Sequence, residues 1–357
     1  MPGFVSVIFG ILLFSILIFV HELGHFLTAK AFGVQVNEFS MFMGPAIFKK
    51  QKGETLYTIR CIPIGGFCAM EGEDQDTDNP RSFQKAAWWK RMIILVAGAA
   101  MNFAIGFVFF AIVFAPLKQV AAPVITEFTD CCTFCGNHGL QLGDEIYEID
   151  GERVYSTSNV SLLLSLNTTG THDVVVLRDG QKVAFDDLSM THTCKDDNGN
   201  DRIHYGFGWG VAEEATFGRK VEAIWYTMLD NVRTVRLSLQ MLLSGQVGLS
   251  EMAGPVGIVD MMSDVATTSD SFWDALLNLV YFGGFLAMNL GVMNLLPIPA
   301  LDGGRVVALL LTTAVEKVTK KKIDPKYEGF IHGVGMILLL ALMALIMFKD
   351  IFTIFKG

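Results

Sequence analysis

Two histidines four residues apart, with a glutamate beside the first, are the residues whose spacing most directly predicts chemistry. They lie in the pentapeptide HELGH at residues 21–25. On a helix, positions i and i+4 project from one face, so His21 and His25 can bind one Zn²⁺ with Glu22 next to them. The preceding residues 4–20 carry no charge. Ionisable side chains at membrane depth indicate function. A helix end with polar residues at the lipid interface is the alternative interpretation.

A third zinc ligand must come from elsewhere, because catalytic zinc usually takes three protein ligands and a water. Asp302 is the candidate, in the run NLLPIPALDGGR at residues 294–305. Pro297 and Pro299 break a helix and the two glycines after Asp302 free the backbone. Irregular backbone at membrane depth is tolerated only where protein buries it or it lines a wet cavity. An ordinary helix end is the alternative, and His332 is the rival ligand.

Such a site predicts hydrolysis of peptide bonds. Zinc held by His21, His25 and Asp302 would lower the pKa of a bound water and polarise the scissile carbonyl. Glu22 would act as the general base, taking a proton from the water and passing it to the leaving nitrogen.

The elements that must position these residues are membrane spans. The chain is 52% hydrophobic and 18% charged, against roughly 25% charged residues in ordinary soluble domains. Four windows are apolar enough to span: residues 4–20, 92–114, 276–297 and 333–348. The first and last are near the lower length limit for a span. The first is not expected to be a cleavable signal peptide, because it lacks a basic region before it and a small-residue cleavage site after it.

Basic residues predict the orientation. Residues 30–91 hold nine Lys and Arg, and residues 305–326 hold six, whereas residues 115–275 hold ten against twenty-three Asp and Glu. The positive-inside rule then places the two basic segments and the zinc site toward the cytoplasm, and the acidic segment and both termini outside. The net charge of −9 and the lack of a basic stripe with interleaved aromatic residues argue against nucleic-acid binding.

The outer segment predicts a small α+β domain. Asp150-Gly151 and Asp179-Gly180 lie between strand-like stretches and indicate hairpins, and residues 156–166 between them indicate a short helix. The order resembles a PDZ domain, with a generic small β-domain as the alternative. Residues 221–243 have helical apolar spacing, typical of an amphipathic helix on the outer leaflet or beneath the domain, or of an ordinary core helix. Four cysteines in this segment are compatible with disulfides, free thiols or a metal: Cys131, Cys132, Cys135 and Cys194.

Together, HELGH and NLLPIPALDGGR resemble the two signatures of the site-2 protease family of intramembrane zinc metalloproteases. The bacterial branch typified by the regulator-of-sigma-E protease is the most similar. Residues 37–45 and 52–67, the latter with a Pro-X-Gly-Gly-aromatic turn, resemble that branch's membrane-associated β-hairpin region, and GPVGI at residues 254–258 resembles its motif before the third span. The chain departs from the family at residues 41–45, where a Gly-aromatic-Gly-Pro run is frequent, and has room for one PDZ domain where well-known members carry two.

The expected fold is therefore a polytopic α-helical membrane protein with four transmembrane helices, a membrane-associated β-hairpin region and one extracytoplasmic PDZ domain. The expected parts are a first transmembrane helix with HELGH (1–33), a cytoplasmic, membrane-associated β-region (34–91), a second transmembrane helix (92–114), the PDZ domain (115–212), an amphipathic linker (213–275), a third transmembrane helix with the LDG motif (276–304), a cytoplasmic loop (305–332) and a fourth transmembrane helix with the C-terminus (333–357).

The resemblance implies an enzyme of the bacterial cytoplasmic membrane that cleaves single-span transmembrane proteins or peptides, such as anti-sigma factors or signal-peptide remnants, with membrane lipids as its other partners. Because a membrane helix hides its carbonyls, cleavage needs local unwinding, and residues 55–60 are expected to offer a strand edge to the substrate. Expected substrate-binding residues are Thr55, Tyr57, Gly65, Gly66, Asn289 and Asn294, the two asparagines having helix packing as an alternative role. A membrane-anchored zincin acting on soluble peptides, a non-catalytic PDZ scaffold and a transporter are the competing functions.

Overall fold

The structure is a computed structural model. It describes residues 3–73, 75, 77–128, 139–167, 170–190, 192–195, 201–248, 254–269, 271–320 and 325–356. The chain divides into two compact units, Met1–Val113 with Val232–Gly357 and Phe114–Asn231. The predicted cysteine cluster of Cys131, Cys132 and Cys135 lies outside the described residues.

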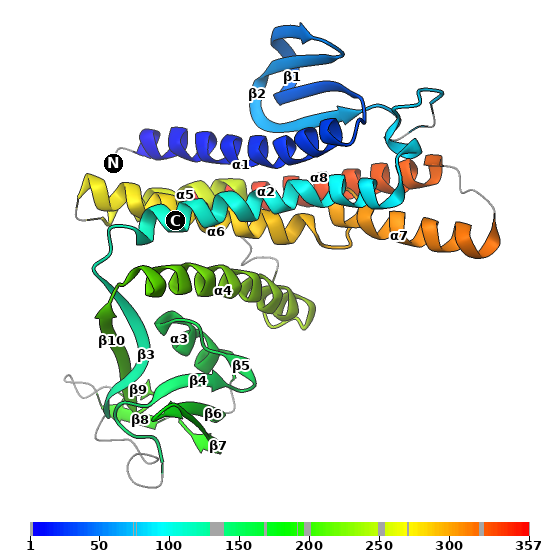
Figure 1. Ribbon diagram of the computed structural model, residues 1–357. Coiled ribbons are helices and arrows are strands. Elements are labelled where there is room, and N and C mark those ends of the chain that lie inside the picture. Colours follow the sequence, from blue (N-terminus) through cyan, green and yellow to red (C-terminus); the bar gives the residue numbers. More distant parts are fainter. Residues whose placement is uncertain are drawn as a thin grey trace. The chain divides into compact units, whose positions relative to one another are not determined.

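Four long helices dominate the first unit: α1 (Gly3–Ala31), α2 (Trp88–Phe114), α6 (Phe272–Asn294) and α8 (Pro325–Lys356) (Figure 1). Each contains a segment long and apolar enough to cross a membrane: Ile8–Ala31, Trp88–Phe114, Phe272–Asn294 and Gly329–Asp350. The four expected helices are thus present, and the first and last are longer than their apolar windows.

Two shorter helices, α5 (Pro255–Thr267) and α7 (Asp302–Thr319), also belong to this unit, as does the end of α4 (Phe217–Leu243) from Val232 onward. The third transmembrane helix was expected to continue to residue 304, and this boundary is wrong. Helix α6 ends at Asn294, before the prolines at 297 and 299. The expected loop after residue 305 is mostly helix α7, which begins at Asp302. Asp302, the predicted third ligand, is therefore the first residue of a new helix, after the turn that follows α6.

The helices pack around two buried clusters. One joins the end of α1 to the β-region and α2 through Ala29, Val34, Phe39, Ile94 and Leu309. The other joins α1, α5 and α6 through Leu13, Leu17, Met262, Leu279 and Ala287. Helix α8 is tied to α5 by a buried charge, because the carboxylate of Asp350 accepts the backbone N–H groups of Gly254 (2.8 Å) and Gly257 (3.0 Å) at the start of α5. A carboxylate is favourable there because the first N–H groups of a helix lack helical partners.

The β-region consists of two long, bent strands, β1 (Val36–Lys52) and β2 (Thr55–Met70), with the short 3-10 helix η1 (Phe83–Lys85) after them. It packs against α1, where the Phe39 ring lies 4.9 Å from that of Phe26 (Figure 1). An ion-pair cluster fastens it further, since Glu54 contacts both Lys30 and Arg81 at 2.5 Å. Hydrogen bonds from the Arg81 guanidinium and the Lys30 ammonium lower the pKa of Glu54 to about 2.

Each bent strand pairs with the other twice. Residues 38–41 pair with residues 56–59 and also with residues 66–69, while residues 46–52 pair with residues 55–60. Residues 56–59 are therefore paired on both sides, and the expectation that this stretch offers a free strand edge is wrong. The strands can turn back because Phe42, Gly44 and Gly65 have positive φ angles, which the extended pattern of the sequence does not reveal. Within the described residues, the segment 66–70 is paired on one side only.

The second unit contains an antiparallel sheet in the order β10-β3-β4-β6-β7, with β5 paired to β4, and a separate hairpin of β8 and β9. Its elements are β3 (Gln119–Phe128), β4 (Glu145–Ile149), β5 (Glu152–Arg153), α3 (Thr157–Leu166), β6 (Thr171–Arg178), β7 (Gln181–Ser189), β8 (His192–Lys195), β9 (Asp201–His204), β10 (Phe207–Glu214) and the start of α4 (Phe217–Leu243).

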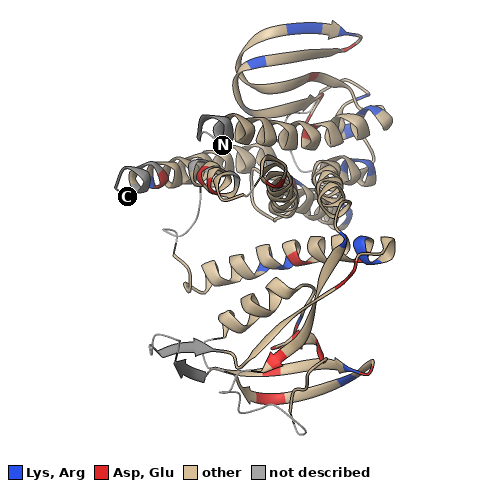
Figure 2. Cartoon of the chain, turned by 90° about the vertical axis from the view of Figure 1, so that its left-hand side faces the viewer, with Lys and Arg blue, Asp and Glu red and all other residues tan. Residues whose placement is uncertain are grey.

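The local predictions for this unit are confirmed. Both Asp-Gly pairs, at 150–151 and 179–180, have positive φ at both residues, as the tight turns that suit the strand twist require. Helix α3 begins after Ser156, which forms a capping box with Asn159. Several Asp and Glu residues lie in the sheet of this unit, whereas the β1–β2 region and the neighbouring helix ends of the first unit contain most of that unit's coloured Lys and Arg residues (Figure 2).

Candidate active site

Three predicted metal ligands converge in the first unit. His21 and His25 lie on one face of α1, and Asp302 is the first residue of α7. The Asp302 Oδ2 atom lies 3.1 Å from His21 Nε2 and 3.2 Å from His25 Nε2, and the two Nε2 atoms are 3.2 Å apart. A metal ion needs at least three His, Cys, Asp or Glu side chains whose ligand atoms lie close together. Among the described residues, His21, His25 and Asp302 form such a group.

The donor set fits zinc. Zinc bonds of 2.0–2.2 Å to nitrogen and oxygen give a ligand tetrahedron with edges of about 3.4 Å, close to the three separations observed. Both histidines are buried, and among the described residues the buried Oδ2 atom of Asp302 has no hydrogen-bond partner, its neighbours being the two Nε2 atoms. A buried carboxylate oxygen is stable only when it is paired or bound to a metal. His332, the rival ligand, is outside this cluster.

The orientation of both imidazoles is set by helix α2. His25 Nδ1 lies 2.8 Å from the Ile94 carbonyl oxygen, to which it donates, leaving Nε2 as the atom that faces Asp302. His21 Nδ1 lies 3.2 Å from the side-chain amide of the buried Asn102. The Asn102 oxygen otherwise has no partner, and turning the amide would let it accept the Nδ1 proton. Such outer contacts fix the tautomer of a ligating histidine.

The sequence patterns alone did not identify the contact of Asn102 with His21. A polar side chain in an apolar span was the signal that could have found it.

Close approach of α1 and α2 requires glycine at two positions. A Cβ at Gly24 would lie 2.4 Å from the Ala97 carbonyl oxygen, and one at Gly98 would lie 2.3 Å from His25 Nε2. Small residues at helix contacts allow such packing in membranes. Gly98 thus makes room for the two imidazoles themselves.

We expect Gly98→Ala to weaken zinc binding and to lower kcat by about 100-fold, because a misplacement near 1 Å can cost that much. The measurement is bound zinc and turnover on one preparation. Gly106→Ala is the matched control on the same helix, since its Cβ would meet the flexible Met288 side chain at 3.2 Å. Normal zinc content and turnover in Gly98→Ala would contradict the packing role.

A cavity of about 570 Å³ opens beside the three ligands. Its wall includes Glu22, His25, Asp302 and residues 67–70 of β2. A second cavity of about 680 Å³ shares Gln75, Ala300, Arg305 and Met336 with the first. The two cavities give water and an extended peptide space next to the ligand set.

Glu22 faces the segment of β2 that is paired on one side. Its carboxylate accepts a hydrogen bond from the backbone of Cys68, and a Cβ at Gly66 would lie 3.5 Å from Glu22 Cγ. Just beyond the end of this segment, Glu73 forms an ion pair with Arg305 of α7 at 2.5 Å. One cavity is therefore lined by the edge segment of β2, by the predicted base Glu22 and by Asp302 at the start of α7.

The other predicted substrate-binding residues do not line this cavity. The buried Thr55 hydroxyl donates to the Val36 carbonyl, and Tyr57 packs on Phe26 and Phe39. Asn289 donates to the Phe285 carbonyl within its own helix, and Asn294 is the last residue of α6. Gly65 lies against Met43, while Gly66 lies near Glu22. Of the set, only Gly66 is thus placed beside the predicted catalytic carboxylate.

Comparison with known proteins shows similarity over nearly the full length. The model of Peptidase family M50 matches residues 9–342. A Clostridium acetobutylicum protein named "Putative zinc metalloprotease" is 31% identical, with 98% of each chain covered. The regulator of sigma-W protease RasP of Bacillus subtilis is 28% identical, with 98% of this chain and 99% of RasP covered. The zinc metalloprotease RasP of Bacillus licheniformis is 29% identical with the same coverage.

Proposed function

The chain belongs to peptidase family M50, and from this premise we propose that it cleaves single-span transmembrane proteins or peptides within the membrane. It is a zinc-dependent, transmembrane metalloprotease. The observation that carries the proposal is the meeting of His21 and His25, which lie within the apolar span of α1, with Asp302 at the start of α7.

The proposed mechanism assigns one role to each residue. The three ligands are His21, His25 and Asp302. His21 is oriented by Asn102, and His25 is oriented by the Ile94 carbonyl. When bound, zinc polarises the scissile carbonyl and makes water a nucleophile near neutral pH. Glu22 takes the water proton on its carboxylate and transfers it to the leaving amide nitrogen.

Substrate positioning is proposed for the β2 segment 66–70. An unwound helix exposes backbone groups that cost several kcal/mol each if left unpaired in lipid. Strand addition to this edge replaces those hydrogen bonds. The support is the one-sided pairing of the segment and its place in the wall of the cavity beside Glu22.

The decisive experiment uses the purified full-length chain in liposomes. We expect cleavage of a single-span reporter to stop with a zinc chelator and to return when zinc is added back. A soluble peptide with the same cleavage sequence is the comparison substrate and should be cleaved at least tenfold more slowly. Equal or faster cleavage of the soluble peptide would favour the membrane-anchored zincin instead.

We further propose that residues 115–212, within the second unit, form a PDZ domain on the extracytoplasmic side of the bacterial cytoplasmic membrane, with both termini on that side. Its hairpins and the helix α3 support the fold. The acidic charge of this segment and the basic residues near the zinc site support the orientation.

An epitope inserted in the turn at Asp179–Gly180 tests the orientation. The epitope should bind antibody on intact spheroplasts, whereas the same epitope at the Gly53 turn between β1 and β2 should bind only after permeabilisation. Antibody access in the reverse order would overturn the proposed topology. Both turns are exposed on the surface.

A further inference from the structure

The turn that precedes Asp302 has an unusual backbone. Ala300 has a φ angle of +82°, in the left-handed region that residues with a Cβ rarely adopt. The turn is also compact, because Cβ atoms at Gly303 and Gly304 would lie 2.3 Å from the carbonyl oxygens of Leu295 and Ile298. A backbone held in such a conformation persists only when its surroundings enforce it.

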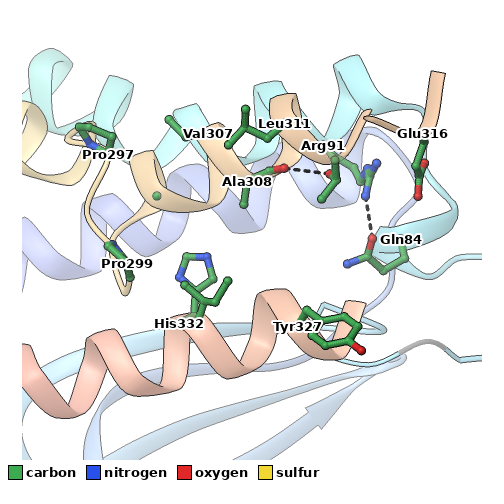
Figure 3. A pocket seen from close by; sticks show the side chains of 13 residues that line it. Gln84, Arg91, Pro297, Pro299, Val307, Ala308, Leu311, Glu316, Tyr327 and His332 are labelled. Carbon is green, nitrogen blue, oxygen red and sulfur yellow. Dashed lines mark hydrogen bonds between the residues drawn. The ribbon is translucent and has the colours of Figure 1, made fainter. Parts of the chain in front are cut away.

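One side chain from α8 contacts this turn directly. The Nδ1 atom of His332 accepts the backbone N–H of Ala300 at 3.0 Å, and His332 is 8% exposed. Helix α8 comes close at the same place, since a Cβ at Gly335 would lie 2.5 Å from the Pro299 Cβ. Figure 3 shows the His332 ring reaching from α8 toward the segment that carries Pro297 and Pro299.

His332 also separates two spaces. It lines the 680 Å³ cavity, which shares residues with the cavity beside His25 and Asp302, and a 360 Å³ cavity between α7 and α8. The smaller cavity has apolar walls of Pro297, Val307 and Leu311 (Figure 3). Since there is open space on both sides of the ring, neighbouring side chains do not fill the place of His332 if it is lost. The turn then loses its hydrogen bond from α8.

We infer that His332 is a positioning residue for the metal site. By accepting the Ala300 N–H, its imidazole stabilises the left-handed backbone two residues before Asp302 and so directs the carboxylate to His21 and His25. The inference rests on the proposed ligand set. It gives His332 a role that differs from ligation, because the ring acts on the backbone of the turn.

The test compares variants at position 332 in the full-length, zinc-loaded protein. His332→Leu removes the acceptor, whereas His332→Asn places a carbonyl oxygen near the position of Nδ1. We expect zinc to dissociate to a competing chelator at least tenfold faster from His332→Leu and within threefold of the wild-type rate from His332→Asn. The visible spectrum of the cobalt-substituted protein should change in the Leu variant and stay unchanged in the Asn variant. Ile331→Ala, which alters an adjacent residue lining the smaller cavity, is the control.

A second variant tests the backbone cause. Glycine adopts positive φ without strain, so Ala300→Gly added to His332→Leu should restore slow zinc dissociation. Wild-type zinc retention in His332→Leu, or equal loss in His332→Leu and His332→Asn, would overturn the inference. If His332→Leu does not fold, the double variant decides: a folded, zinc-retaining protein supports the inference, and a failure to fold or to hold zinc overturns it.

Failure of the ligand set itself gives a different result. Normal zinc retention and cobalt spectrum in Asp302→Asn would remove the premise, whatever the variants at 332 do. Zinc loss in Asp302→Asn together with normal retention in His332→Leu would overturn only the positioning role.

Discussion

Glu22→Gln is expected to abolish cleavage while zinc stays bound. The amide keeps the size of the side chain and spares His21, His25 and Asp302, but it cannot accept the proton from water. Removal of a general base typically costs about 10²–10⁴-fold in rate, so turnover should fall at least by this factor. Zinc content and cleavage of a single-span reporter should be measured on the same preparation.

The matched control is Glu148→Gln, the same change at a carboxylate of the second unit. It should retain both zinc and turnover. Turnover of Glu22→Gln within tenfold of the wild-type value would show that Glu22 is not the base. Loss of zinc together with turnover would instead show that Glu22 supports the ligand set.

Asp302→Asn is expected to weaken zinc binding as well as activity. An amide oxygen carries no charge and is a poorer zinc ligand than a carboxylate, and the buried His21 and His25 would lose their anionic partner. We expect zinc affinity to fall at least about tenfold, comparable with the smallest losses seen when only an outer partner of a ligand is removed. Competition with a chelator of known affinity measures the change.

Asp260→Asn, at an exposed residue of α5, is the control for the chemical change alone. Two results together would identify a different third ligand: wild-type zinc affinity in Asp302→Asn and loss of zinc in His332→Ala. The first of these results is incompatible with the ligand set that we propose.

Local patterns were sufficient for much of this molecule. The i, i+4 spacing places His21 and His25 on one face of any helix, and the structure places both beside Asp302. Apolar runs indicated the four long helices because length and hydropathy are properties of a single segment. The Asp-Gly pairs at 150 and 179 indicated tight turns for the same reason, since their backbone preference is local.

Contacts between distant residues were decided only by the tertiary structure. Asn102 is 81 positions from His21, and the Ile94 carbonyl is 69 from His25, so no periodicity along the chain could reveal that they orient the ligands. A free strand edge was predicted at residues 55–60, whereas the segments paired on one side are 46–52 and 66–70. The reason is that the strands bend at Phe42 and Gly65, so that residues 38–41 pair with two segments of β2. Histidine is a residue type suited to metal ligation, yet the ring of His332 accepts the backbone N–H of Ala300. Residue type and spacing determined which groups can hold a metal, and three-dimensional packing decided which groups meet and which only support them.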